Sequence, residues 1–310
     1  MDTTENKLPS SRLFPSIRWS IMLVLAMLVA TVVLSIMLAA VWTIIIYITE
    51  KPSSFDLQFF EEMSASFTIP TYLITTPVVF GSTIGLIYYV NRKSSLTLIP
   101  IKKFTLHQLP CTLVITIGAL IISSEIQNMT SQLVPFASFF DEAIAEFLVF
   151  TPGAIFAVCI IAPLSEEFLF RGCLLRTMIT KHKKWTSILV SAVLFGFFHI
   201  NPGQIPYAFF IGLVLGWLYY KTSSVWLCII AHMINNMTTF LAIYMAENNM
   251  VDIPGFISPD MFETTSNQPL WLTGLGMMAL AVGLFLLQKN TSIQDSLMSL
   301  NKTDKIYSSS

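Results

Sequence analysis

WSIMLVLAMLVATVVLSIMLAAVWTIIIYI, residues 19 to 48, is a charge-free apolar run, and it is longer than the roughly 20 residues that cross a bilayer as a helix. It also far exceeds the roughly 7 to 15 residues of a signal-peptide core, so we expect an uncleaved first span. Seven further apolar runs follow, at 70–90, 109–122, 144–162, 185–200, 205–220, 225–244 and 270–287. The pattern predicts an all-α, polytopic membrane protein of about eight transmembrane helices.

The composition supports a membrane environment. Hydrophobic residues make up 54% of the 310 positions and charged residues only 11%, against about 25% charged in soluble domains. A formal net charge of -1 gives no basic footprint, so no nucleic-acid partner is expected. The expected surroundings are a lipid bilayer.

The positions of the positive charges orient the spans. With a cytoplasmic amino terminus, the eight spans place every Lys and Arg except Lys51 on the cytoplasmic side, as the positive-inside rule requires. An odd number of spans would break this pattern. Both termini are therefore predicted to be cytoplasmic.

The chain divides into four predicted segments. Residues 1–16 form a cytoplasmic tail and 17–143 the amino-terminal spans. Residues 144–245 form the core that carries the chemistry, and 246–310 an outer loop, the last span and a second cytoplasmic tail. The loops at 50–69 and 246–269 are long enough to fold over the outer face.

Ionisable side chains inside spans cost about 2.5 to 3.5 kcal/mol each, so each is a functional hypothesis. The first cluster is SEEFLFRG, residues 165–172. Glu167 and Arg171 are four apart and can form a salt bridge on one helical face. Glu166 points about 100° away from Glu167, which leaves it without a local partner and able to face a cavity. The alternative is that all three charges mark a helix end at the cytoplasmic surface.

Two further clusters carry the remaining polar groups. FGFFH ends at His199, and HMINN begins at His232 and ends at Asn236, four residues later on the same face. Alone, His199 could be an interfacial residue, and the His232–Asn236 pair could hydrogen-bond two helices together.

Depth arithmetic favours one shared site. At 1.5 Å per residue, and with the fourth helix continuing to Ile179, Glu166 lies roughly 20 Å above the cytoplasmic edge. His199 lies roughly 21 Å above it, and His232 and Asn236 roughly 10 and 16 Å. All four side chains therefore fall in the bilayer interior, within about one side-chain length of a common level.

Such a set has the groups needed to hydrolyse an amide bond. A buried carboxylate can activate water, an imidazole can orient that water, and a second imidazole with an amide can stabilise an oxyanion. Glu166, His199 and His232 could instead bind one divalent metal such as zinc, with an open fourth position. The chain has no HExxH motif, which excludes a thermolysin-like match. The choice between a metal and a metal-free site stays open.

In order and spacing, EExxxR, FxxxH and HxxxN resemble the CPBP family, the CAAX-protease and bacteriocin-processing proteins, also called Abi or type II CAAX prenyl endopeptidases. The segment from Phe210 to Trp226 is similar to the family's linker between the second and third motifs. The resemblance implies an all-α intramembrane protease with its active-site cavity inside the membrane. It implies that Glu166 is the base and His199 its partner on the water. It also implies that His232 and Asn236 bind the oxyanion, while Glu167 and Arg171 are structural support. Family names describe metalloproteases, but the same residues are also interpreted as a metal-free glutamate protease.

The expected substrate is a peptide or a lipid-modified, CAAX-like protein tail, and the expected location is a bacterial inner membrane. Two other functions remain open: a non-catalytic bacteriocin-immunity or scaffold protein with the same fold, and a small proton-coupled transporter. Gly212 and Gly216 could admit a lipid tail or a neighbouring helix.

Overall fold

The computed structural model describes residues 13–50, 57–92, 104–134, 150–257 and 266–307, and in these parts the chain is helical with no strand longer than a single bridge. Within these described residues, six helices are long and apolar enough to cross a membrane. The predicted class, an all-α polytopic membrane protein, is confirmed. Residues 1–12, 51–56, 93–103, 135–149, 258–265 and 308–310 lie outside the described parts. Most of the predicted tail at 1–16 and parts of the predicted loops at 50–69 and 246–269 are among them.

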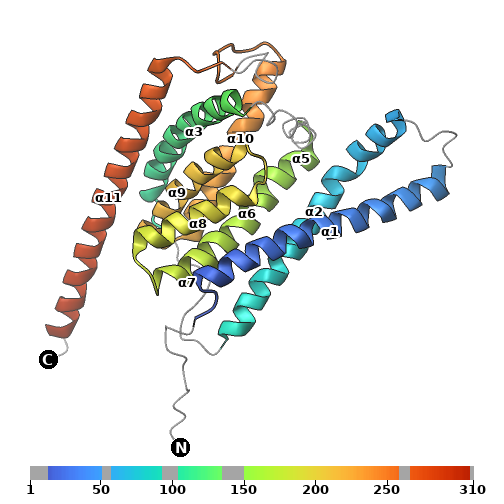
Figure 1. Ribbon diagram of the computed structural model, residues 1–310. Coiled ribbons are helices and arrows are strands. Elements are labelled where there is room, and N and C mark those ends of the chain that lie inside the picture. The colour runs from blue at the N-terminus through green and yellow to red at the C-terminus, as the bar shows by residue number, and fades with distance from the viewer. Residues whose placement is uncertain (1–12, 51–56, 93–103, 135–149, 258–265, 308–310) are drawn as a thin grey trace, which may run out of the picture.

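The first two helices form an antiparallel pair on one side of the molecule. α1 (Ile17–Glu50) packs along α2 (Leu57–Asn91), and their far ends lean away from the other helices (Figure 1). Helix α2 already begins at Leu57, so much of the stretch predicted as an outer loop at 50–69 is helical. Two prolines, Pro70 and Pro77, lie inside α2, and each removes one backbone hydrogen bond.

On the opposite side, α3 (Gln108–Leu133) packs against α11 (Leu270–Tyr307) at short range. A Cβ on Gly118 would lie 2.7 Å from the backbone oxygen of Gly276, and a Cβ on Gly276 would lie 2.7 Å from the side chain of Ile121. The two backbones approach so closely because neither helix carries a side chain at these positions. Both helices run well past their predicted ends at 122 and 287.

The fourth apolar run is displaced from its predicted bounds of 144–162. The helix begins at Pro152, because Thr151 caps it by accepting a hydrogen bond from the Ala154 amide at 3.2 Å. It continues to Ile179 as the segments α5 (Pro152–Phe156), η3 (Ala157–Ile161), α6 (Ala162–Glu167), η4 (Phe168–Leu175) and α7 (Arg176–Ile179). This helix, 152–179, packs against α2, α8, α9 and α10 and is the centre of the molecule.

Three helices complete the core. They are α8 (Lys184–Phe198), α9 (Gln204–Thr222) and α10 (Val225–Glu247). Helices α8 and α9 pack closely, since a Cβ on Gly212 would lie 3.0 Å from the Cα of Ala192. Gly212 therefore admits a neighbouring helix and not a lipid tail. Helix α8, with 15 residues, is shorter than the roughly 20 of a full span, and α9 is not among the six long apolar helices.

The loop after α10 folds over the end of α3, as the sequence allowed. Asn128 donates a hydrogen bond to the backbone oxygen of Gly255 at 2.6 Å, and Gln132 donates to the side-chain oxygen of Asn267 at 2.7 Å. The Glu125 carboxylate accepts from the amide of Gln268 at 2.9 Å. These contacts join α3, the loop and the start of α11.

Candidate active site

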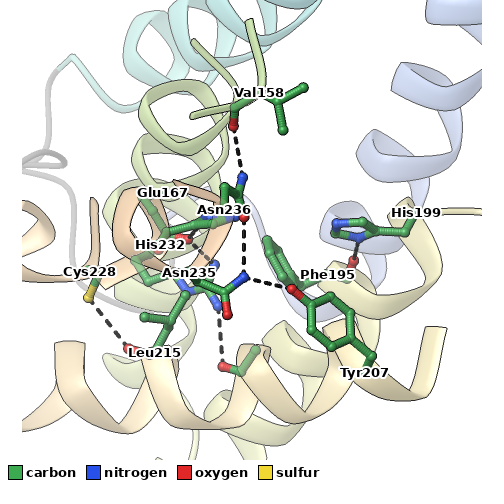
Figure 2. Close-up of polar contacts among 12 residues, drawn as sticks. Val158, Glu167, Phe195, His199, Tyr207, Leu215, Cys228, His232, Asn235 and Asn236 are labelled. Atoms are coloured by element: carbon green, nitrogen blue, oxygen red, sulfur yellow. Dashed lines mark hydrogen bonds and ion pairs between the residues drawn. The ribbon is translucent and has the colours of Figure 1, made fainter. Parts of the chain in front are cut away.

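Glu166 and Glu167 of the first motif lie in α6, between two π-helical segments of helix 152–179, and Arg171 lies in the second of these segments. In η3 the amide of Ala162 donates to the carbonyl of Ala157, five residues earlier. In the same register Val158 would receive its hydrogen bond from residue 163, but Pro163 has no N–H. The Val158 carbonyl is therefore open to a side chain, and Asn236 of α10 donates to it at 2.8 Å (Figure 2). Single π turns of this kind are frequent at functional sites.

Glu167 and Arg171 form a fully buried ion pair. The guanidinium Nη1 lies 2.7 Å from Oε1 of Glu167, and both side chains are 0% exposed. Arg171 also donates to the backbone oxygen of Gly212 at 3.3 Å and lies over the ring of Phe195, 4.4 Å from its centroid. The predicted salt bridge is confirmed. Arg171 itself was counted among the cytoplasmic charges, and that assignment is wrong, because Glu167 holds it inside the protein.

The same carboxylate oxygen also holds His232. Nδ1 of His232 lies 2.9 Å from Oε1 of Glu167. A carboxylate only accepts hydrogen bonds, so Nδ1 carries the proton and Nε2 is directed away from Glu167. Glu167 thus fixes the orientation of a candidate catalytic imidazole in addition to pairing with Arg171. Sequence spacing gives no sign of this link, since 65 residues separate the two partners.

His199 lies at the carboxyl end of α8 and is oriented by its own helix. Its Nδ1 is 2.9 Å from the backbone oxygen of Phe195, and because a carbonyl only accepts, Nε2 again faces away. The Phe195 ring lies between the two imidazoles, with centroids 5.0 Å from His199 and 5.8 Å from His232. Among the described residues, His199 makes no hydrogen bond to Glu166, His232 or Asn236.

Glu166 is buried without a full set of partners. It is 7% exposed, and its Oε2 has no hydrogen-bond partner within the described parts of the chain. Its carboxylate lies within electrostatic range of two phenols, Tyr72 of α2 and Tyr207 of α9. A buried carboxylate oxygen without a donor costs several kcal/mol unless something binds to it. The cavity expected beside Glu166 stays a prediction, and the position of Tyr72 shows that α2 contributes to the surroundings of this carboxylate.

Two polar residues that the sequence analysis did not single out belong to the same network. Asn235 donates from Nδ2 to the hydroxyl of Tyr207 at 2.6 Å and to Oδ1 of Asn236 at 3.2 Å. The doublet Asn235-Asn236 was visible in the sequence, but only the second residue matched a motif. Adjacent residues of a helix point about 100° apart, so the doublet by itself gives no sign of a shared network.

The candidate metal ligands are not grouped as a metal site requires. In the part of the chain that the structure describes, no three His, Cys, Asp or Glu side chains lie together so that they could hold a metal ion. Glu166, His199 and His232 are suitable zinc ligands by chemistry, and the Nδ1 contacts of the two imidazoles leave each Nε2 free, so it is the separation of the three side chains that counts against zinc. The zinc alternative finds no support in this arrangement.

The structure therefore brings the predicted residues into one region without joining them all. Glu167, Arg171 and His232 form one connected set, and Asn236 with Asn235 and Tyr207 forms a second. The catalytic roles expected for Glu166, His199, His232 and Asn236 stay predictions.

Comparison with known proteins gives a family model that matches this region, and a similar protein. The family model described as "Type II CAAX prenyl endopeptidase Rce1-like" matches residues 148–238. A Bacillus subtilis (strain 168) protein named "Putative membrane peptidase YdiL" is 28% identical over 106 residues, which cover 34% of this chain and 43% of that relative. The chain thus matches less than half the length of this relative.

No solved structure matches the chain significantly. The matched segment contains all three motifs, from Glu166 to Asn236. The resemblance to the CPBP family that the three motifs indicate is thus confirmed over residues 148–238, which are similar to type II CAAX prenyl endopeptidase Rce1-like proteins.

Proposed function

We propose that the protein is an intramembrane endopeptidase that hydrolyses a peptide bond of a membrane-associated peptide or of a lipid-modified, CAAX-like protein tail. The observation that carries the proposal is the buried Glu166, whose Oε2 has no hydrogen-bond partner among the described residues. A protein that only bound a partner or scaffolded the membrane would gain nothing from this costly group.

In the proposed reaction, Glu166 takes a proton from a water molecule, and Nε2 of His199 accepts the water's second hydrogen bond. The water oxygen attacks the scissile carbonyl carbon and gives a tetrahedral oxyanion. When this intermediate collapses, the carbon–nitrogen bond breaks and Glu166 returns the proton to the leaving amine. No group other than water and the substrate is consumed.

The oxyanion is stabilised from α10. Because Nδ1–H of His232 is bound to Glu167, Nε2 is the atom of this imidazole that can face the substrate, and it donates to the oxyanion when it carries a proton. Asn236 uses one amide N–H for Val158 and has a second for the oxyanion. Removing one such donor typically lowers the rate about 10²- to 10³-fold.

The test is cleavage by the purified protein, in lipid nanodiscs, of a matched panel of prenylated and unprenylated peptides. Glu166→Gln keeps the shape of the side chain but cannot act as a base, so we expect a loss of about 10²- to 10⁴-fold in kcat. Glu247→Gln, at the exposed carboxyl end of α10, is the matched control and should cleave like the parent. Full activity of Glu166→Gln, or no cleavage by the folded parent, would contradict the proposal.

Two further arms of this assay address the substrate and the metal. A preference for prenylated peptides would identify a lipid-modified tail as the substrate class, and equal cleavage of both sets would identify a plain peptide. The proposed reaction uses no metal ion, so a chelator should leave the rate of cleavage unchanged. Chelator-sensitive cleavage restored by zinc would replace this mechanism with a metal-dependent one.

We further propose a bacterial inner membrane location with both termini in the cytoplasm. The distribution of Lys and Arg supports this orientation, and α1 begins on the same side of the molecule on which α11 ends (Figure 1). Reporter fusions at both ends should report the cytoplasm, and opposite locations for the two reporters would contradict the orientation.

A further inference from the structure

Tyr207 is the polar side chain of α9 that reaches the network on α10. Figure 2 shows it pointing from α9 toward Asn235, and its hydroxyl lies 2.6 Å from Nδ2 of Asn235. The phenol is also within electrostatic range of the Glu166 carboxylate on helix 152–179. One hydroxyl group thus connects the helix of the candidate base with the helix of the candidate oxyanion donors.

Asn235 determines how this hydroxyl can act. Its side chain is buried, 3% exposed, and its amide nitrogen donates both to Tyr207 and to Oδ1 of Asn236. In these contacts the Tyr207 oxygen is the acceptor, so the hydroxyl proton is left to point at another group. This position of the Asn235 amide costs free energy, because its buried Oδ1 has no hydrogen-bond partner among the described residues.

Asn235 also ties Tyr207 to Asn236. One amide nitrogen thus holds both the hydroxyl of Tyr207 on α9 and the side chain of Asn236 on α10. Asn236 is in turn fixed by the open Val158 carbonyl of the π turn. Two donors held by one buried amide meet the requirement for stabilising developing charge, namely that the donors are oriented before the reaction.

We propose that Tyr207, oriented by Asn235, is a further hydrogen-bond donor of the site and stabilises the oxyanion beside Asn236. This inference rests on the proposed protease function and extends it to two residues outside the three motifs. Tyr207 touches the reacting atoms, whereas Asn235 is a positioning residue that acts through Tyr207 and Asn236. No proton is transferred by either residue.

Tyr207→Phe tests the proposal because it removes one oxygen and keeps the ring. We expect kcat to fall about 10²-fold, with KM and the melting temperature unchanged. Tyr220→Phe, at the other end of the same helix, is the matched control and should keep full activity. Glu166→Gln is measured in parallel, so that a failed inference can be told from a failed function.

A Tyr207→Phe variant with full kcat beside an inactive Glu166→Gln variant would overturn the inference and leave the protease function standing. If Glu166→Gln also cleaves normally, both are overturned. A loss in Tyr207→Phe that parallels a drop in melting temperature would assign the hydroxyl to folding and overturn the inference.

The double variant adds a test of the Asn235 link. Asn235→Leu keeps the approximate volume but removes the donor that orients Tyr207. If the two residues act as a unit, Tyr207→Phe combined with Asn235→Leu should lose less activity than the product of the two single losses. A double variant equal to that product would show that they act independently, and the positioning role of Asn235 would be refuted.

Discussion

Removing the positive charge of the buried ion pair should destabilise the protein strongly. Arg171→Met keeps the length and apolar stem of the side chain but deletes the guanidinium, which lies 2.7 Å from a fully buried carboxylate and 3.3 Å from the Gly212 oxygen. Breaking one side of a buried pair typically costs about 3 to 5 kcal/mol. At about 2 to 4 °C per kcal/mol for a chain of this size, the melting temperature should fall by about 6 to 20 °C.

His232 determines how much stability the Arg171→Met variant loses within this range. It keeps a hydrogen bond of 2.9 Å to the stranded Glu167, so the carboxylate is not left entirely without a donor. The second variant therefore removes both charges: Glu167→Gln with Arg171→Met leaves an oxygen that still accepts from His232. Because a neutral, well-packed pair avoids the cost of burying charge, the double variant should be more stable than Arg171→Met alone.

The assay is thermal unfolding in detergent micelles, followed by intrinsic fluorescence, for the parent and the three variants. Arg18→Met removes an exposed charge from α1 and is the matched control, with an expected change near zero. The reasoning would be refuted if Arg171→Met melted like the parent. It would also be refuted if the double variant melted as low as Arg171→Met, because the loss would then come from packing and not from a stranded charge.

The remaining predictions concern helix packing and the π turn. Gly118→Ala should lower the melting temperature by the equivalent of about 1 to 3 kcal/mol, since its Cβ would lie 2.7 Å from the Gly276 oxygen. The control is Gly85→Ala on α2, where a Cβ would meet nothing within 4 Å. This variant should be neutral or stabilising in the same unfolding assay. Pro163→Ala supplies a backbone N–H that competes with Asn236 for the Val158 carbonyl, so kcat should fall while the protein stays folded; unchanged kcat in the peptide assay would contradict the role given to that carbonyl.

The sequence was sufficient to predict the helical membrane fold and the local ion pair. Glu167 and Arg171 are four residues apart on one helix, and such pairs follow from helical geometry alone. The bond between Glu167 and His232 could not be predicted, because it depends on how α10 packs against helix 152–179. The same reason hid Tyr207, a lone phenol in an apolar segment whose partner lies 28 residues away.

Element bounds were predicted less well than element identity. The run at 144–162 gave the right kind of element but the wrong start, since apolar residues continue across a helix boundary that Thr151 and Pro152 set. The two π turns left no sign in the hydrophobic pattern. A π turn changes which backbone groups pair without changing which side chains are apolar.

The π turn at Ala157–Ile161 also affects how sequences of this kind should be compared. A turn closed by hydrogen bonds between residues five apart holds one residue more than an α-helical path of the same rise, as if a single residue had been inserted. A relative that lacks this residue would run α-helically through the same length, and its two helix halves would align with this chain only across a one-residue gap. Deleting one of these five residues should restore α-helical hydrogen bonding. It should also rotate the helical segment that carries Glu166 by about 100° relative to Pro152–Phe156. The number of residues between Thr151 and the first motif therefore determines how Glu166 is oriented in the site.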